Sequence, residues 1–393
     1  METPNKGDSR WGSLFKNDLQ GMLLPILLIT IIGSVNIFSA TYISSIYENT
    51  GLLGYFLKHM TFLLLSMAVG VILYRYDYRQ LQKPHMLQRI MIATLIGMIL
   101  VLAVGAVING ARRWIVIGPV SIQPSEFAKL AALIWTSAKL STMRKWGKPR
   151  HINPLINLQG YFSERISYML PMLIWPTIFA GLTILQPDMG TTVLIFGFSF
   201  VLIYLAGFDG KFFGGAFVIA GFLGFIAARM SPYRWERIQS WFDPWPHAQD
   251  MGYQTVQGLL AVGSGGILGE GFMQGTSKYF YLPEAHTDFA FAVWAQEMGF
   301  IGAVFVVVLI AAFTYFGFRI SNKARDEFGK WLAMGITLLI SGQALFNIAM
   351  VCGIMPVTGV PLPFVSYGGS SLLMNFMAIG KKPWFVREKN IVK

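Results

Sequence analysis

Three titratable side chains lie close together in a short polar segment that precedes a long apolar one. Glu284, His286 and Asp288 alternate along the run LPEAHTDF, and the apolar residues 289–318 follow. A partly desolvated carboxylate has a raised pKa and is therefore a better proton acceptor. We expect Asp288 to act as a general base, and Glu284 and His286 to position a substrate or shape the loop. The alternative for Asp288 is to cap the following helix, which Thr287 can do equally well.

Cationic side chains near this acidic segment are candidates to bind an anionic group. Arg112 and Arg113 stand in a short connection between two apolar segments, and their planar guanidinium groups suit phosphate oxygens. Lys278 opens the acidic segment itself. The alternative for any one of these cations is to snorkel at a membrane interface. The cations expected on this face are Arg112, Arg113, Arg229, Arg234, Arg237 and Lys278.

Two charged residues, Glu126 and Lys129, fall within an apolar segment, where an unpaired charge is costly. They are three residues apart, so on a helix they share a face and neutralise one another. A structural ion pair is the favoured interpretation. The alternative is that this face orders an outer loop or presents Lys129 to a phosphate.

Two further motifs combine turn residues with polar side chains. In QPDMGTT, turn chemistry explains Asp188, and the alternative is that Gln186, Asp188 and Thr191 together line a substrate cavity. In PLPFVSYGGSS, prolines and paired glycines bend the final apolar segment and permit close packing or a substrate groove. Ser366 is a candidate for contact with substrate there, although no GxSxG elbow surrounds it.

Membrane helices must position these residues, because 54% of the 393 residues are hydrophobic and only 13% are charged. A helix needs about 20 apolar residues to cross the hydrocarbon core. The sequence predicts an all-α polytopic membrane protein with about ten transmembrane helices and one large extracytoplasmic loop. The predicted spans are residues 21–42, 56–74, 88–109, 124–141, 167–185, 189–208, 212–230, 289–318, 329–353 and 365–384.

The net charge of +12 has a topological pattern. Most of the 31 Lys and Arg residues fall in the tails and in alternate connections, which the positive-inside rule assigns to the cytoplasm. We therefore predict cytoplasmic tails at residues 1–20 and 385–393, a membrane domain at 21–384, and no nucleic-acid partner. The single cysteine, Cys352, falls within an apolar span and is expected to pack there.

The large loop, at about residues 231–287, contains two distinct segments. The run YRWERIQSWFDPW is amphipathic and aromatic, which favours a helix lying at the membrane interface. The run GYQTVQGLLAVGSGGILGEGF is rich in glycine and apolar residues, which favours a re-entrant or loop-like element packed against other helices.

Several common cofactor motifs are absent from the sequence. It contains no Walker A, GxGxxG, HExxH or CxxC pattern, and its five histidines have no ligand spacing. The sequence therefore predicts no metal centre. A divalent cation that bridges a pyrophosphate to Asp288 is an open alternative.

Five motifs, in order along nearly the whole chain, resemble the SEDS family, to which FtsW, RodA and SpoVE belong. The motifs are ARRWIVIGPVSIQPSEFAKLA, QPDMGTT, GYQTVQGLLAVGSGGILGEGF, YLPEAHTDFAFAVWAQEMG and MPVTGVPLPFVSYGGSSLL. They are closer to FtsW than to RodA. Ala290, Trp294 and Gln296 depart from the residues that we expect in the fourth motif.

The resemblance implies a peptidoglycan glycosyltransferase that polymerises lipid II, an undecaprenyl-pyrophosphate-linked disaccharide peptide. The site would face outward from the bacterial cytoplasmic membrane, with Asp288 as the catalytic base that accepts the hydroxyl proton and with inversion at the anomeric carbon. A class B penicillin-binding protein is the implied partner, along with other membrane proteins of the divisome or elongasome. The sequence leaves open a role in division or in elongation. Two other functions compete, a lipid II flippase and a non-catalytic scaffold for a penicillin-binding protein.

Overall fold

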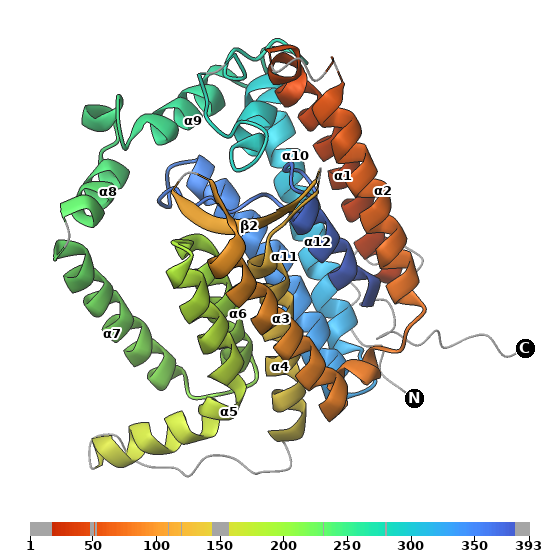
Figure 1. Cartoon of the computed structure of the whole chain (residues 1–393), viewed down its shortest axis with the longest axis vertical. Helices are drawn as coiled ribbons and strands as arrows, with labels where there is room; N and C mark the ends of the chain where they lie inside the picture. The colour runs from red at the N-terminus through yellow and green to blue at the C-terminus, as the bar shows by residue number, and fades with distance from the viewer. Residues whose placement is uncertain are drawn as a thin grey trace, which may run out of the picture.

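The computed structural model describes most of the chain as one helical bundle (Figure 1). The described residues are 18–47, 51, 53–108, 110–118, 120–143, 157–230, 232–279 and 281–381. The predicted C-terminal tail lies outside them, as does the predicted N-terminal tail up to residue 17.

Each of the ten predicted spans corresponds to a helix within the described residues, and the predicted boundaries mostly agree within a few residues. The largest difference is in the fifth helix, which begins at Leu158 rather than at residue 167. The helices are α1 (Asp18–Tyr47), α2 (Gly54–Tyr74), α3 (Pro84–Val104), α4 (Pro124–Met143), α5 (Leu158–Leu185), α6 (Met189–Leu205), α7 (Gly210–Arg229), α10 (Ala290–Asn322), α11 (Glu327–Val351) and α12 (Gly369–Lys381).

Six of these helices are long and apolar enough to cross a membrane: α1, α2, α3, α5, α10 and α11. Shorter apolar stretches occur in α6, α7 and α12. Helix α4 is also 20 residues long, but it is less apolar because it carries Glu126, Lys129 and Lys139. Leu64 on α2 and Val104 on α3 are both 66% exposed, as expected of side chains that face lipid. The chain is a multi-pass membrane protein, which confirms the prediction.

The fold is mostly helical, as predicted, and the exception among the described residues is the connection between α3 and α4. A three-stranded antiparallel sheet forms there, with β2 (Ala111–Ile117) between β1 (Ala106–Ile108) and β3 (Val120–Ile122). β-Branched residues dominate these strands, and Gly110 and Gly118 supply positive φ in the two turns. The third helix therefore ends at Val104, and the residues that were predicted to continue it form β1.

The large loop contains the two segments that the sequence predicted. The amphipathic run forms α8 (Pro232–Phe242), and η3 (Trp245–His247) precedes α9 (Tyr253–Ser264). Glycine-rich residues then follow α9 and pair with α10, where the Gly271 N–H donates to the Glu297 carbonyl at 3.1 Å and the Phe300 N–H to Gly266 at 2.9 Å. In Figure 1 this loop lies at one end of the bundle, above α10 and α11.

Helix α10 is interrupted at Gly299, whose φ of 66° is outside the helical region. A Cβ atom at this position would lie 2.3 Å from the Gly269 nitrogen, so only glycine fits. Trp294 donates to the Gly302 carbonyl across the break at 2.9 Å. The Gln296 amide hydrogen-bonds Ser264, Glu270, Thr276 and Ser277 of the glycine-rich loop. Two of the residues that depart from the family pattern thus hold this break together.

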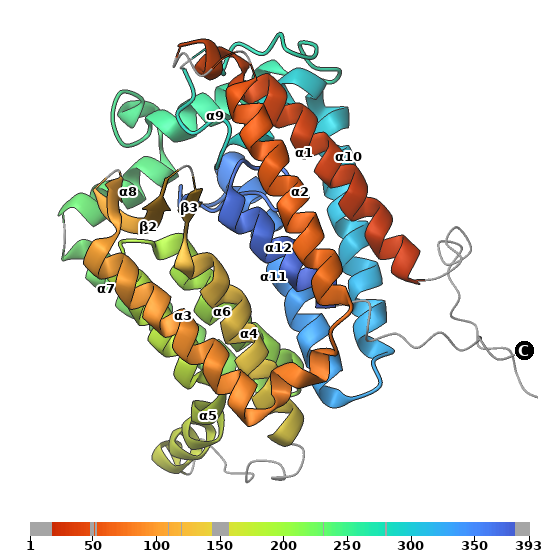
Figure 2. The same cartoon turned by 45° about the vertical axis from the view of Figure 1, so that its right-hand side comes forward.

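The centre of the bundle is built from α10, α11 and α4, and α1 and α2 cover one side. Helix α1 packs along α10, and α2 packs along the short helix α12, as both views show (Figures 1 and 2). The extended segment between α11 and α12 therefore runs through the middle of the molecule. It passes beside the start of α10, where Asp288 lies.

Candidate active site

Asp288 ends the turn Glu284–Asp288 before α10, which we call the acidic turn. The backbone of Asp288 is held by α11. The Asn347 side chain is fully buried on α11 and donates to the carbonyl of Asp288 and to that of Val360, both at 2.7 Å. One amide therefore joins the acidic turn to the extended segment. Phe289 is the N-cap of α10 and has no side-chain cap, so the capping role considered for Asp288 is not what the structure shows.

The carboxylate of Asp288 is half-buried and accepts no hydrogen bond from any residue that the structure describes. Gly359 lies beside it at a φ of +75°, and a Cβ atom there would come within 3.3 Å of Asp288 Oδ2. Burial raises the pKa of Asp288 to about 7, and the negative charges of Glu284 and Asp188 add to the rise, while Arg113 opposes it. Near neutral pH such a carboxyl group exchanges protons readily.

Arg112 and Arg113 are directed to opposite sides, because adjacent residues of a strand alternate between its two faces. Arg112 donates to the carbonyls of Leu102 and Ala103 at 3.3 and 3.2 Å, and thereby satisfies the open end of α3. Arg113 donates to the carbonyl of Gln186 at 3.1 Å and to that of Pro187. Of these two arginines, it is Arg113 that lowers the pKa of Asp288.

The QPD turn forms the side of the site opposite the acidic turn. Asp188 caps α6 by accepting from the Thr191 N–H at 3.0 Å and from its hydroxyl at 2.9 Å. Gln123 also donates to Asp188, at 3.4 Å. Gln186 is fully buried and donates to the Met98 carbonyl at 3.4 Å, whereas its Oε1 has no hydrogen-bond partner among the described residues. The turn interpretation of Asp188 therefore holds, and the same turn adds a negative charge near Asp288.

Glu284 and His286 shape the acidic turn in different ways. Glu284 adopts a φ of 55° and accepts from the Thr287 hydroxyl at 2.6 Å. The His286 carbonyl accepts from the Tyr367 N–H at 2.8 Å, and the His286 ring packs against Tyr55 and Tyr367, with centroids 5.7 and 5.6 Å away. Glu284 therefore stabilises the turn from within, and His286 joins it to Tyr55 at the start of α2 and to Tyr367 before α12.

The pair Glu126 and Lys129 is buried and structural. The two charged groups are 2.8 Å apart, and the Lys129 ammonium also donates to Gln343 at 2.7 Å. Gln343 in turn donates to the Pro361 carbonyl at 2.9 Å. The ion pair thus supports the extended segment beside Asp288. Lys129 is 1% exposed, so the alternative in which it contacts a phosphate does not fit this structure.

Lys278 is likewise paired rather than available to a phosphate. Its ammonium lies 2.7 Å from Glu297 on α10 and 2.9 Å from the Ser39 hydroxyl on α1. Ser366 is buried, and its hydroxyl accepts from the Leu362 N–H at 2.8 Å within a turn. The expectation that these two residues bind substrate is therefore corrected, since both side chains complete the packing of the site from behind.

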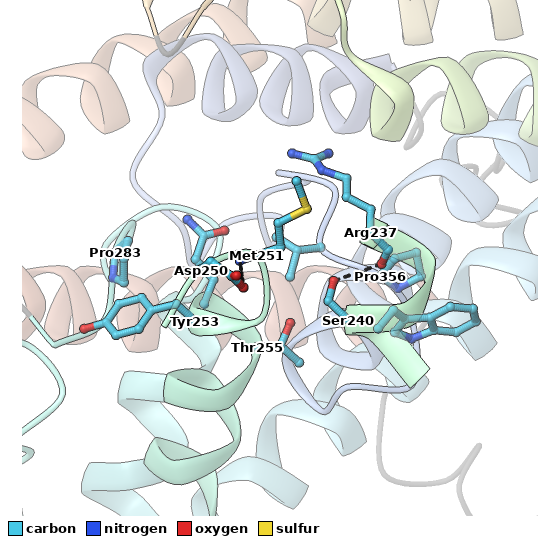
Figure 3. Close-up of a pocket in the computed structure, with 11 residues that line it drawn as sticks. Arg237, Ser240, Asp250, Met251, Tyr253, Thr255, Pro283 and Pro356 are labelled. Atoms are coloured by element: carbon cyan, nitrogen blue, oxygen red, sulfur yellow. Dashed lines mark hydrogen bonds between the residues drawn. The ribbon is translucent and has the colours of Figure 1, made fainter. Parts of the chain in front are cut away.

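A cavity of about 360 Å³ adjoins the acidic turn (Figure 3). Its walls come from α8, including Arg237 and Trp241, from α9, including Tyr253 and Thr255, and from the extended segment. Pro283, directly before Glu284, and Val357, two residues before Gly359, are among the lining residues, so the cavity lies next to the turn. Both α8 and α9 belong to the large loop, which therefore forms part of the site.

Sequence reasoning did not identify Asn347, Gly359 or Gln343. Gln343 and Asn347 are four residues apart on the apolar helix α11, and polar residues within a membrane helix are a recognised sign of function. That spacing was the available signal. Gly359 had none, because its role depends on the contact with Asp288.

The residues present do not form a metal-ligand set. No group of three or more His, Cys, Asp and Glu side chains that could hold a metal ion occurs in the described part of the chain. Asp188 also uses both carboxylate oxygens in hydrogen bonds. The described residues bring together a carboxyl group with a pKa near neutrality, a nearby guanidinium group and an adjoining cavity.

Comparison with known protein families gives a match over nearly the whole chain. The family model of FtsW, RodA and SpoVE, described as "Cell cycle protein", matches residues 20–381. Stage V sporulation protein E of Bacillus subtilis (strain 168) is 35% identical over 367 residues, which cover 92% of this chain and 95% of that protein. The probable peptidoglycan glycosyltransferase FtsW of the same organism is 30% identical, covering 91% and 88%.

Solved structures agree with this match. A chain from a study titled "Structural coordination of polymerization and crosslinking by a peptidoglycan synthase complex" superposes with a TM-score of 0.72 at 27% identity, covering 92% of this chain and 95% of that one. The crystal structure of the rod shape determining protein RodA of Thermus thermophilus gives a TM-score of 0.61 at 26% identity, covering 92% and 94%.

Proposed function

Because the chain belongs to the family of FtsW, RodA and SpoVE, we propose that it is a peptidoglycan glycosyltransferase that polymerises lipid II into glycan strands. The observation that carries the proposal is Asp288, a half-buried carboxyl group whose pKa is raised to about 7, in a turn whose preceding residue, Pro283, lines a cavity.

In the proposed reaction, a hydroxyl group of the acceptor sugar attacks the anomeric carbon of the donor. The new C–O bond forms on the face opposite the leaving group, so the configuration inverts. The bond between the anomeric carbon and the pyrophosphate oxygen breaks, and the electron pair leaves with the phosphate. Asp288 accepts the proton from the attacking hydroxyl, a step for which a positioned base supplies about 10²–10⁴-fold in rate.

Arg113 is the cation best suited to the departing pyrophosphate. It lies within the electrostatic reach of Asp288, and its guanidinium group is held by the carbonyls of the QPD turn. Glu284, His286, Gln186, Asp188 and Thr191 are proposed to shape the substrate cavity. Lys129, Glu126, Lys278 and Ser366 support it from the interior, and Arg112 holds the sheet against α3.

We further propose that the protein lies in the bacterial cytoplasmic membrane with both termini in the cytoplasm and Asp288 on the outer side. A class B penicillin-binding protein is the proposed partner, as part of a division or elongation complex. The relation to a protein from a peptidoglycan synthase complex supports the partner, and the similarity to FtsW supports a role in division.

The test is polymerisation of labelled lipid II by the purified chain, alone and with its partner. Asp288→Asn keeps the shape of the side chain but removes the base, so we expect glycan synthesis to fall by about 10²-fold or more. Glu236→Gln, at an exposed acid of α8, is the matched control and should retain activity. Undiminished polymer from a folded Asp288→Asn protein would refute the mechanism.

The same preparation separates the competing functions. A flippase would move lipid II across vesicles without forming polymer. A scaffold would support growth with Asp288→Asn and would show no synthesis with either variant.

A further inference from the structure

A second cavity, of about 270 Å³, lies at the opposite end of the bundle and is rich in arginine. It is lined by Arg75, Asp77, Tyr78, Arg79 and Arg325. Four helices that are apolar enough to span a membrane end at its rim, since α2 ends at Tyr74, α3 begins at Pro84, α10 ends at Asn322 and α11 begins at Glu327. The cavity is therefore at the depth of lipid headgroups.

The walls of this cavity are held together by a clamp around Asp326. The hydroxyl of Tyr78 donates to the Asp326 carboxylate, and Arg79 Nε lies 3.3 Å from it. The other oxygen of Asp326 caps α11 by accepting from the Gly329 N–H at 2.8 Å. Tyr78 is 3% exposed and stacks on Phe328. These contacts fasten the short helix η2 (Tyr78–Gln82) to the start of α11, so the cavity is a built feature.

The cavity keeps an excess of positive charge, because its three arginines are balanced by only two carboxylates, Asp77 and Asp326. Asp326 is engaged by Arg79 and Tyr78, and Asp77 uses one oxygen to cap η2 through the Arg79 N–H at 3.0 Å. Arg75 and Arg325 are exposed, and their side chains form no ion pair or hydrogen bond with any residue in the described part of the chain. Two like charges on one cavity repel each other, and an anion between them removes that cost.

We propose that this cavity binds the phosphate of an anionic phospholipid in the leaflet opposite Asp288. Guanidinium groups bind phosphate oxygens through paired hydrogen bonds, and basic pockets between membrane helices suit lipid headgroups. A lipid fits better than free phosphate because Val71 and Ile72, one turn before Arg75, are 60% and 55% exposed and can contact acyl chains. Tyr74 and Tyr76 add the aromatic side chains typical of an interface.

The test compares lipid binding by the full-length protein and three variants in detergent. Native mass spectrometry measures bound phosphatidylglycerol and phosphatidylcholine. We expect the wild-type chain to prefer phosphatidylglycerol and the double variant Arg75→Gln/Arg325→Gln to lose affinity for it by roughly 30-fold. Arg89→Gln, an exposed arginine on α3 outside the cavity, is the matched control and should bind as the wild type does.

Each other outcome overturns the proposal. Equal binding by the double variant and the wild type, or equal losses in the double variant and in Arg89→Gln, would show that the cavity has no special role. Displacement of the lipid by millimolar inorganic phosphate would identify a free-phosphate site. An absence of lipid preference together with binding of an acidic peptide would indicate a protein partner instead. The variant Arg75→Lys/Arg325→Lys keeps both positive charges, and we expect it to retain part of the lipid binding. Loss of all binding in this variant would show that the substitutions disturb folding rather than charge.

Discussion

At the scale of single residues, the site depends on how a carboxyl group is surrounded. Asp288 receives no hydrogen bond from described residues to stabilise its charged form, and burial together with the charges of Glu284 and Asp188 raises its pKa to about 7. The neighbouring glycine, Gly359, leaves its Oδ2 side open. The backbone is nevertheless rigid, because Asn347 holds the Asp288 carbonyl. The carboxyl group is thus partly exposed, while the backbone that carries it is held in place.

This environment predicts the pH dependence of polymerisation. The base must be ionised to accept a proton, so below about pH 7 the rate should fall about tenfold per pH unit, and above it the rate should level off. An unperturbed aspartate, with a pKa of about 3.9, would give a constant rate over this range. The measurement is the initial rate of glycan synthesis between pH 5.5 and about 8.5.

Glu284→Gln provides the internal control for that profile. It removes a negative charge that raises the pKa of Asp288, so the break in the rate should move to lower pH. A profile that is flat, or that is the same in both proteins, would argue against Asp288 as the titrating group.

At the scale of elements, two buried ion pairs hold the site. Lys129 and Glu126 on α4 support the extended segment through Gln343, and Lys278 and Glu297 join the large loop to α10. Paired charges in a low-dielectric interior bring little net stability, but a single one left unpaired is strongly unfavourable. These pairs therefore fix an arrangement of helices around Asp288.

A double-mutant cycle at α4 tests this interpretation. Lys129→Met leaves Glu126 buried without its partner, and we expect it to lower the free energy of unfolding by about 3–5 kcal/mol. Glu126→Gln/Lys129→Met removes both charges and should recover most of that loss. Thermal unfolding of purified protein in detergent measures both. If the double variant were as unstable as Lys129→Met, unpaired charge would not be the cause.

At the scale of the whole molecule, two sites lie at opposite ends of one bundle. Helix α9 lies at one end of the bundle, and the connections from α2 to α3 and from α10 to α11 lie at the other (Figures 1 and 2). Residues of these two connections line the arginine cavity. Helices α10 and α11 run from one end to the other. From this separation we propose that Asp288 and Arg75 face opposite sides of the membrane.

Cysteine labelling in intact cells tests that orientation. Cys352 is the only cysteine, so Cys352→Ser gives a clean background. A membrane-impermeant maleimide should label Tyr281→Cys, a site that is 59% exposed near Asp288, without permeabilisation. Lys83→Cys, between η2 and α3, should be labelled only after the membrane is opened. Labelling of Lys83→Cys from outside would reverse the proposed topology.

The sequence by itself determined the helical framework, because a membrane span is a continuous apolar segment whose length is set by the thickness of the bilayer. It also identified Asp288 and the acidic turn, since a polar run beside an apolar helix is a local feature. It did not predict the sheet of residues 106–122, where strand and helix compete over short apolar runs.

Only the tertiary structure decided which charged residues face the site. Lys129 and Lys278 are both lysines in motifs of interest, yet each is paired with an acid on a helix, and Arg112 and Arg113 separate because a strand alternates its side chains. The contribution of Asn347 and Gly359 depends on contacts between segments far apart in the chain. Such contacts have no local signature, since the energy of a buried charge or amide depends on whichever partner the fold brings to it.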